Sequence, residues 1–193
     1  MHFASRLRVC ALALPLLWSS ACASEDDGDG AGAVDDRNTY CAQVADWDPE
    51  WEAFEADVLA LVNDVRSTGT TCGGEAMPEV GPLTMQGQLR CAARVHSLDM
   101  AENEFFDHTN LEGQSPWDRM ELAGYAMSAG GENIAAGYPT PQAVVDGWLN
   151  SPGHCRNIMG ANFTEIGVGY AAPEGAGSFG SYWTQVFGSP AAP

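Results

Sequence analysis

Near Asn162 the spacing of apolar side chains changes from helical to alternating, and this change restricts the fold class. Before it, four helix starts use the same device, a capping residue followed by Pro at the first helical position, where the missing N–H costs no hydrogen bond. These starts are Asp48-Pro49, Ser115-Pro116, Thr140-Pro141 and Ser151-Pro152. After it, residues 166–170 alternate apolar side chains with glycines, and residues 182–187 form a second strand. Several helices followed by a terminal hairpin predict an α+β fold rather than a parallel sheet.

The same spacing gives the extent of each predicted helix. The first runs from Pro49 and ends before Gly69, and a second covers about residues 84–103. Three short helices follow and end near Gly124, Asn150 and Met159. Residues 77–82 are predicted to form a loop, and residues 130–134 to leave a turn and enter an ordered segment.

Length and charge limit the number of domains and the kinds of partner. The 193 residues are enough for one ordinary domain with an extension, and 45% of them are apolar, which allows a sizeable core. The eight basic residues, all Arg, face 26 acidic ones, which gives a net charge of −18. Binding to nucleic acid or to an anionic lipid surface needs concentrated positive charge. The composition therefore excludes both as partners, and the absence of Lys excludes Schiff-base chemistry.

The first 23 residues have the three parts of a secretory signal. Arg6 and Arg8 precede an apolar run over residues 9–18, and small residues follow at positions 19–23. The apolar run is too short to remain as a membrane-spanning helix. We therefore expect residues 1–23 to direct export.

Two cleavage sites fit this signal. Ordinary cleavage would come before Ser24; the alternative is a bacterial lipobox in which Cys22 becomes the lipidated first residue, with Ser19 where Leu or Val is usual. Residues 24–40 are acidic and Gly-rich, so they are predicted to form a disordered linker, and the domain is assigned to residues 41–193. A tether between a lipid and a domain has this composition, which favours the anchor over a free N-terminus. Either way, the protein is expected to be extracellular or in the outer cell envelope, with a lipid anchor as its one link to a membrane.

The domain contains four of the six cysteines, and removal of the signal leaves six Arg against 26 acidic residues, a net charge of −20. The cysteines are Cys41, Cys72, Cys91 and Cys155. An even number in an exported chain predicts two disulfides, with three pairings open. Zinc ligation fits less well, because no two of them show CxxC spacing. Cys155 lies beside His154, but adjacent residues in a helical turn face different directions, so a disulfide is favoured over a papain-like pair.

The three histidines of the domain differ in their predicted settings. His96 lies on an apolar helix face, which favours a packing role. His108 lies in a loop after the second helix, and His154 lies in the first turn of a short helix. Glu132 is a carboxylate with no basic neighbour in the sequence. Two imidazoles and one carboxylate from separate segments could converge to bind Zn²⁺ or a similar ion.

Five strings occur in an order that is similar to one known family. They are SPWDRMELAGY, GGENIAAGYP, VVDGWLNSPGHCRNIM, NFTEIGVGYA and YWTQVFG. Together they resemble the bacterial branch of the CAP superfamily, also called the SCP domain, which groups cysteine-rich secretory proteins, antigen 5 and the plant pathogenesis-related 1 proteins. The resemblance covers residues 52–188, nearly the whole domain.

The resemblance implies a three-layer α-β-α sandwich with a small antiparallel sheet between helices. It also implies a central cleft with two His and two acidic residues that often holds a divalent cation. His108 and His154 match the two family His residues, and Glu132 matches the Glu of the GEN motif. The remaining acid is replaced by Ser151, three residues after Trp148, so the cleft has lost one charged ligand.

Two hypotheses for function follow from this resemblance. The leading one is a non-enzymatic extracellular binding module, expected as a monomer, for a small hydrophobic ligand such as a lipid or sterol-like molecule, or for an envelope protein, with Zn²⁺ or another divalent cation in the cleft. The alternative is a metal-dependent hydrolase in which His108, Glu132 and His154 form an open zinc site. No nucleophile or second general base is evident, which favours the binding module. The same three residues could also brace the cleft without a metal.

The positions of the predicted helices favour one disulfide pairing. Cys72 follows the first helix and Cys91 opens the body of the second, so a bridge between them would close the intervening loop. We therefore predict a Cys72–Cys91 bridge and a Cys41–Cys155 bridge, the second joining the N-terminal segment to the helix of His154.

Overall fold

The computed structural model of the protein describes residues 32–175 and 178–192. The predicted signal over residues 1–23, the lipidation candidate Cys22 and the first part of the predicted linker lie outside these residues. Within the described part of the chain, no helix combines the length and the apolar character needed to cross a membrane.

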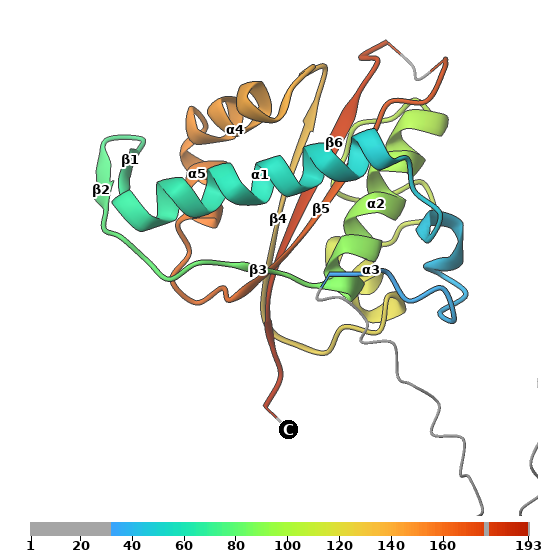
Figure 1. The fold of residues 1–193 in the computed structure, drawn as a ribbon, viewed down its shortest axis with the longest axis horizontal. Helices are drawn as coiled ribbons and strands as arrows, with labels where there is room; N and C mark the ends of the chain where they lie inside the picture. The colour runs from blue at the N-terminus through green and yellow to red at the C-terminus, as the bar shows by residue number, and fades with distance from the viewer. Residues whose placement is uncertain (1–31, 176–177, 193) are drawn as a thin grey trace, which may run out of the picture.

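A four-stranded sheet forms the centre of the domain (Figure 1). Its strands, in spatial order, are β3 (Thr84–Met85), β5 (Glu165–Ala171), β6 (Tyr182–Pro190) and β4 (Met127–Ala136). β5 and β6 are the two alternating strands predicted near the C-terminus, and they pair antiparallel, as do β6 and β4. The two-residue β3 runs parallel to β5. The predicted α+β class with a small, mainly antiparallel sheet is confirmed.

Helices cover both faces of this sheet (Figure 1). One face carries α1 (Pro49–Thr68), α4 (Pro141–Leu149) and α5 (Pro152–Ile158), and the other carries α2 (Gly87–Glu102) and α3 (Pro116–Leu122). Side chains along β6 alternate between the two faces of the sheet. Trp183 and Phe187 pack in the core cluster of α1, α4 and α5, and Val186 packs in the cluster of α2 and α3. The three-layer arrangement implied by the resemblance is confirmed.

Each predicted pair of a cap and a Pro begins a helix. Asp48 accepts a hydrogen bond from the N–H of Glu50 at 2.8 Å. Ser115 and Asp118 form a reciprocal capping box at the start of α3. Ser151 precedes α5 without a side-chain capping bond, so the helix does not use its hydroxyl.

α2 begins later than predicted, because β3 takes the preceding residues into the sheet. The helix then lies directly on two glycines of β5. A Cβ added to Gly167 would lie 2.0 Å from the carbonyl carbon of Leu89, and one added to Gly169 would lie 2.4 Å from that of Ala93. The glycines between the apolar positions of β5 therefore allow strand and helix backbones to approach closely.

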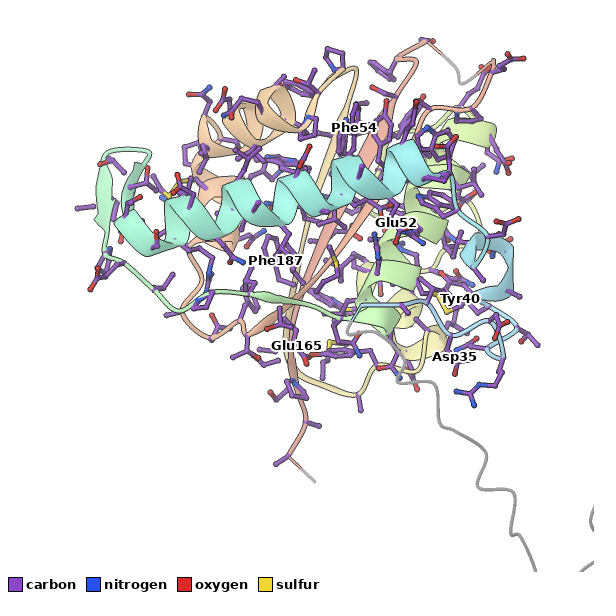
Figure 2. All side chains as sticks on the ribbon, viewed as in Figure 1. Asp35, Tyr40, Glu52, Phe54, Glu165 and Phe187 are labelled. Carbon is purple, nitrogen blue, oxygen red and sulfur yellow. A yellow bond between two sulfur atoms is a disulfide. The ribbon has the colours of Figure 1, made fainter. Side chains whose placement is uncertain are left out.

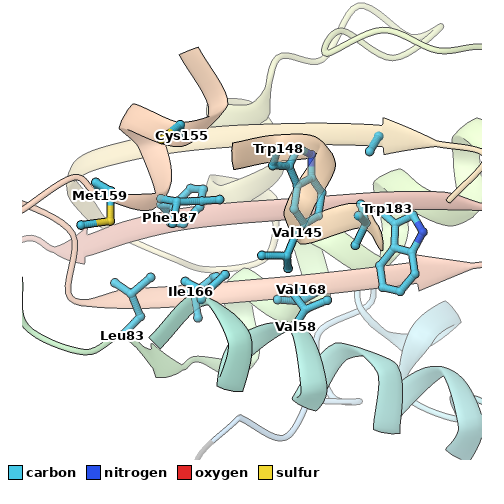
Figure 3. Packing of buried hydrophobic residues seen from close by; sticks show 14 of the residues in the cluster. Val58, Leu83, Val145, Trp148, Cys155, Met159, Ile166, Val168, Trp183 and Phe187 are labelled. Atoms are coloured by element: carbon cyan, nitrogen blue, oxygen red, sulfur yellow. The ribbon is translucent and has the colours of Figure 1, made fainter. Parts of the chain in front are cut away.

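The larger core cluster lies between the sheet and α1, α4 and α5, and Figure 3 shows its packing. Trp148 of α4 and Trp183 of β6 are its largest side chains, and both are fully buried. The indole Nε1 of Trp148 donates to the carbonyl oxygen of Ile134 at 3.2 Å, which ties α4 to the edge strand β4. Burial of side chains this large stabilises the fold by more than about 2 kcal/mol each.

Part of the predicted linker packs against the domain. The Gly32 carbonyl accepts from Arg90 at 3.2 Å, and the Asn38 amide donates to the carbonyl of Leu122 at 3.0 Å. Tyr40 packs against the core cluster of α2 and α3 (Figure 2). Contacts with the domain therefore begin before residue 41, where the sequence places the boundary.

The disulfide pairing predicted from the sequence is wrong. The structure joins Cys41 to Cys91 and Cys72 to Cys155, across sequence separations of 50 and 83 residues. All four cysteines are in disulfides, as predicted, but the local bridge between the first two helices does not exist.

A hairpin absent from the sequence prediction accounts for this difference. β1 (Thr70–Cys72) and β2 (Glu75–Met77) pair just after α1, and the turn between them lies against the start of α5, where a Cβ on Gly73 would come within 2.8 Å of Pro152. The hairpin therefore carries Cys72 to α5 instead of α2. Cys91 packs in one cluster with Cys41, which precedes the short 3-10 helix η1 (Ala42–Val44).

Candidate functional site

The structure brings His108 and Glu132 into direct contact. His108 lies in the loop between α2 and α3, and Glu132 lies within β4. Nδ1 of His108 is 2.8 Å from Oε1 of Glu132, whose side chain is 2% exposed, whereas that of His108 is 49% exposed. The hydrogen bond to Glu132 raises the pKa of His108 above its usual value, against the opposing effect of partial burial. The contact therefore favours a protonated imidazole on a buried carboxylate.

Sequence reasoning missed Arg119, the second partner of Glu132. Nη2 of Arg119 donates to Oε2 of Glu132 at 2.7 Å, and Nη1 donates to the carbonyl oxygen of Gln114 at 2.9 Å. The Arg119 side chain is 1% exposed and lies on α3, which contacts β4. A buried carboxylate needs an opposite charge, and this rule could have pointed to the Arg of SPWDRM. Both carboxylate oxygens of Glu132 thus accept hydrogen bonds.

His154 lies in the same cleft without a side-chain hydrogen bond to His108 or Glu132 among the described residues. It occupies the first turn of α5, and it lines one cavity together with His108. Burial, reinforced by the nearby His108, lowers the pKa of His154 below its usual value. Ser151, the residue in place of the family acid, lines an adjoining cavity together with His154. The structure therefore places His108, His154 and Ser151 along adjoining cavities, and it buries Glu132 behind His108, the one of the three that Glu132 contacts directly.

Buried amides fix β4 relative to α5. The Asn133 amide donates to Gln185 and to the backbone carbonyl of His154, both at 3.1 Å. Asn157 of α5 donates to the side-chain oxygen of Asn133 at 2.8 Å and to the backbone carbonyl of Glu132 at 3.2 Å. These bonds hold the strand of the carboxylate and the helix of His154 in one geometry.

His96 is fully buried, as its apolar helix face predicts, and it supports the loop that carries His108. Its Nε2 lies 3.0 Å from the backbone carbonyl oxygen of Asp107, so Nε2 is the donor and carries the proton of the neutral ring. Nδ1 is buried and has no hydrogen-bond partner in the described part of the chain. Burial, reinforced by the positive charge of Arg119, lowers the pKa of His96 to about 4.

Acid is therefore expected to destabilise the fold through His96. Because its pKa drops from 6.5 to about 4 on folding, the unfolded chain binds more protons between these values. The stabilisation is complete above about pH 6.5 and falls by about 3 kcal/mol as the pH drops to about 4. Urea unfolding at both pH values should show this loss in the unmodified protein and a smaller loss in His96→Gln, whose amide can donate to the Asp107 carbonyl. Equal losses in the two proteins would contradict the assignment.

Two adjoining cavities open beside the His108–Glu132 contact. One, of about 250 Å³, is lined by Phe106, Asp107, His108, Ile134 and His154. The other, of about 330 Å³, is lined by Phe106, Ile134, Ala135, Ala136, Tyr138, Gly147, Trp148, Ser151, His154 and Phe179. Because they share Phe106, Ile134 and His154, they form one groove along β4, called the β4 groove below. Its walls are mainly aromatic and aliphatic, and its His108 end is polar.

The donor atoms of the cleft do not fit a metal ion in this arrangement. One oxygen of Glu132 accepts from His108 and the other from the guanidinium of Arg119. Across residues 32–175 and 178–192, no group of three His, Cys, Asp or Glu side chains could hold an ion. An ion would have to displace His108 from Oε1, beside the positive charge of Arg119. What the cluster provides as it stands is hydrogen bonding and charge neutralisation at the polar end of the β4 groove.

Comparisons with known proteins agree with the motif series. The sequence model of the cysteine-rich secretory protein family, CAP, matches residues 59–187. The uncharacterized protein YkwD of Bacillus subtilis is 44% identical over 135 residues, which are 70% of this chain and 47% of that protein. The uncharacterized membrane protein YlbC of the same organism is 42% identical over 74 residues, 38% of this chain and 21% of that protein.

One solved structure is similar in both fold and sequence. It is an extracellular protein containing an SCP domain from Bacillus anthracis, with a TM-score of 0.60 and 27% identity, covering 74% of this chain and 44% of that chain. The chain thus spans less than half the length of each of these Bacillus proteins. The similarity concerns the domain that carries the β4 groove.

Proposed function

Because the chain belongs to the cysteine-rich secretory protein (CAP) family, we propose that it acts outside the cell as a non-enzymatic binding module whose ligand lies in the β4 groove. The continuity of the groove carries this proposal, since its two cavities share Phe106, Ile134 and His154. Largely apolar walls with a few polar groups at one end are typical of small-molecule sites. They suit a ligand with a hydrophobic body and a polar end.

The charge around the β4 groove limits the ligand further. No Arg lines either cavity, and the whole chain carries a net charge of −18. Both oxygens of Glu132 are engaged, one with His108 and the other with Arg119, so neither is free to take a proton from a water in the groove, which supports binding over hydrolysis. An uncharged or cationic hydrophobic molecule is therefore favoured over an anionic one.

Filling the β4 groove with a large side chain is expected to weaken ligand binding. Nile red, an uncharged apolar dye, should bind the purified secreted protein with a rise in its fluorescence. Ala136→Trp would place an indole in the groove and should weaken dye binding at least about tenfold. Ala161→Trp, a matched change at an exposed position outside the groove, should leave dye binding unchanged. Equal dye binding by the two variants would refute the proposed site.

A divalent cation in the cleft stays a prediction, and thermal melts with zinc and with chelator can test it. Ser151→Glu would restore the fourth family ligand and is expected to enlarge the rise in melting temperature with zinc, because metal bound to the folded state alone stabilises it. Glu132→Gln should reduce that rise, and Ser67→Glu, at an exposed position of α1, should leave it unchanged. The effect should weaken as the pH falls through and below about 6.5, because imidazole ligates when neutral and the contact with Glu132 raises the pKa of His108 above its usual value. Melts identical with zinc and chelator in all variants would leave His108 and Glu132 as a brace.

A further inference from the structure

Four aromatic side chains from four separate segments line the larger cavity of the β4 groove. Phe106 follows α2, Tyr138 follows β4, Trp148 lies on α4 and Phe179 precedes β6. The cavity has a volume of about 330 Å³, and its remaining lining is mostly small or aliphatic. Aromatic rings present a negative face, so a cavity with four of them attracts a positive charge more strongly than a cavity of the same size with aliphatic walls.

Packing holds these rings in place. Phe106 and Phe179 contact each other, with ring centroids 6.0 Å apart, and they are 46% and 52% exposed at the mouth of the cavity. The Tyr138 ring lies on Gly147 of α4, where a Cβ would come within 2.6 Å of the ring carbon Cζ. Trp148 is fully buried, and its hydrogen bond to Ile134 fixes its position. The aromatic walls are therefore largely formed before a ligand arrives.

The charged side chains near this cavity are compatible with a cationic ligand. No Arg lines the cavity, and the chain has no Lys. Asp107 lines the adjoining cavity, next to Phe106. The nearby guanidinium of Arg119 is buried and paired with Glu132. A positive charge in this cavity would therefore meet negative ring faces. His108, whose protonation the Glu132 contact favours, lines the adjoining cavity and not this one, and there it is paired with Glu132 and lies beside Asp107.

We propose that this aromatic cavity binds a quaternary or methylated ammonium group. Aromatic walls attract such a cation through the ring quadrupole, and the alkyl groups on nitrogen gain by leaving water. The hydroxyl of Ser151 and the imidazole of His154 stand at the same cavity and supply polar contacts for the rest of the ligand. This inference rests on the proposed function, and it adds the chemical class of the ligand's head group.

Choline and its uncharged analogue 3,3-dimethylbutan-1-ol test the proposal, because they share a shape and differ in charge. Titration of the purified secreted protein, followed by intrinsic tryptophan fluorescence, should show choline binding about tenfold more tightly than the alcohol. Equal affinities, or tighter binding of the alcohol, would overturn the ammonium site.

A matched pair of variants locates the effect. Phe179→Leu should weaken choline binding about tenfold and change alcohol binding by less than about threefold, because Leu keeps apolar area but removes the ring face. Trp117→Leu removes a ring that is 45% exposed and outside the cavity, and it should change neither affinity. Loss of both affinities in the Trp117 variant, or unchanged choline binding in the Phe179 variant, would overturn the assignment. If choline fails to bind while Nile red still binds the β4 groove, the ammonium site is refuted and the binding module stands; if neither binds, both fail.

Discussion

Replacing Glu55 by Leu is expected to lower the free energy of unfolding by about 3–5 kcal/mol, because it removes the one buried carboxylate that two buried guanidinium groups share. Glu55 of α1 is 0% exposed, and its Oε2 lies 2.8 Å from Arg90 and 2.7 Å from Arg94. Its other oxygen accepts from the backbone N–H of Tyr170 at 3.3 Å, which links α1, α2 and β5. Removal of one partner from a buried pair leaves the other charge desolvated, and that penalty dominates the loss.

Glu52 provides the matched control for this prediction. It lies one turn before Glu55 on α1 (Figure 2), 3.0 Å from Arg90, but its side chain is 51% exposed. Glu52→Leu should therefore cost less than about 1 kcal/mol, as expected for a solvated ion pair. Urea unfolding of both variants at neutral pH measures the difference. Losses of the same size would show that burial does not set the strength of this network.

Removal of the Cys72–Cys155 bridge is expected to destabilise the protein by about 4–5 kcal/mol, because the bridge spans a long segment of the unfolded chain. The closed segment covers 83 residues, and its loss restores conformational entropy to the unfolded state. The double variant Cys72→Ala with Cys155→Ala, unfolded in urea beside the unmodified protein, measures this loss.

The second bridge separates the general effect of a cross-link from a local one. Replacement of Cys41 and Cys91 by Ala opens a segment of 50 residues and should cost about 4 kcal/mol. Cys155 follows His154 directly on α5, so loss of the first bridge should also weaken Nile red binding in the β4 groove, whereas loss of the second should not. Non-reducing peptide maps that link any other cysteines would refute both expectations.

Features set by neighbouring residues could be predicted from the sequence. The pairs of a cap and a Pro mark the starts of α1, α3, α4 and α5, because capping and the fixed φ of Pro act within one turn. The alternating pattern after Asn162 marks β5 and β6, since one period governs each strand. The three-layer packing of helices and sheet could not be predicted from the residues themselves. It was implied by the family that the five motifs resemble.

Features that depend on a distant partner could not be predicted. β3 has two residues, and it exists because they pair with β5, far along the chain. The pairing of Cys72 follows from where the β1–β2 hairpin meets α5, which no local pattern records. Arg119 lies 13 residues before Glu132, and their side chains meet because α3 packs against β4 in the folded domain.

The candidate site shows the same division. The family resemblance identifies His108, Glu132, His154 and Ser151. The structure places His108, His154 and Ser151 along the β4 groove, with Glu132 buried behind His108. The aromatic wall of the β4 groove escaped the sequence analysis, because Phe106 and Phe179 come from two loops without a shared motif. Their rings meet because the fold brings the loop after α2 and the loop before β6 together.

Chemical-shift mapping of the isotope-labelled protein with 1-decanol, an uncharged ligand, tests the binding module most directly. The account predicts that signals of Phe106, Ile134 and Phe179 shift together as the alcohol is added, because all three line the β4 groove. Leu111 and Leu122 are also exposed, at 68% and 43%, but they lie outside the groove and their signals should stay in place. Shifts confined to these two leucines, or no shifts at saturating alcohol, would contradict the proposal that this domain binds its ligand in the β4 groove.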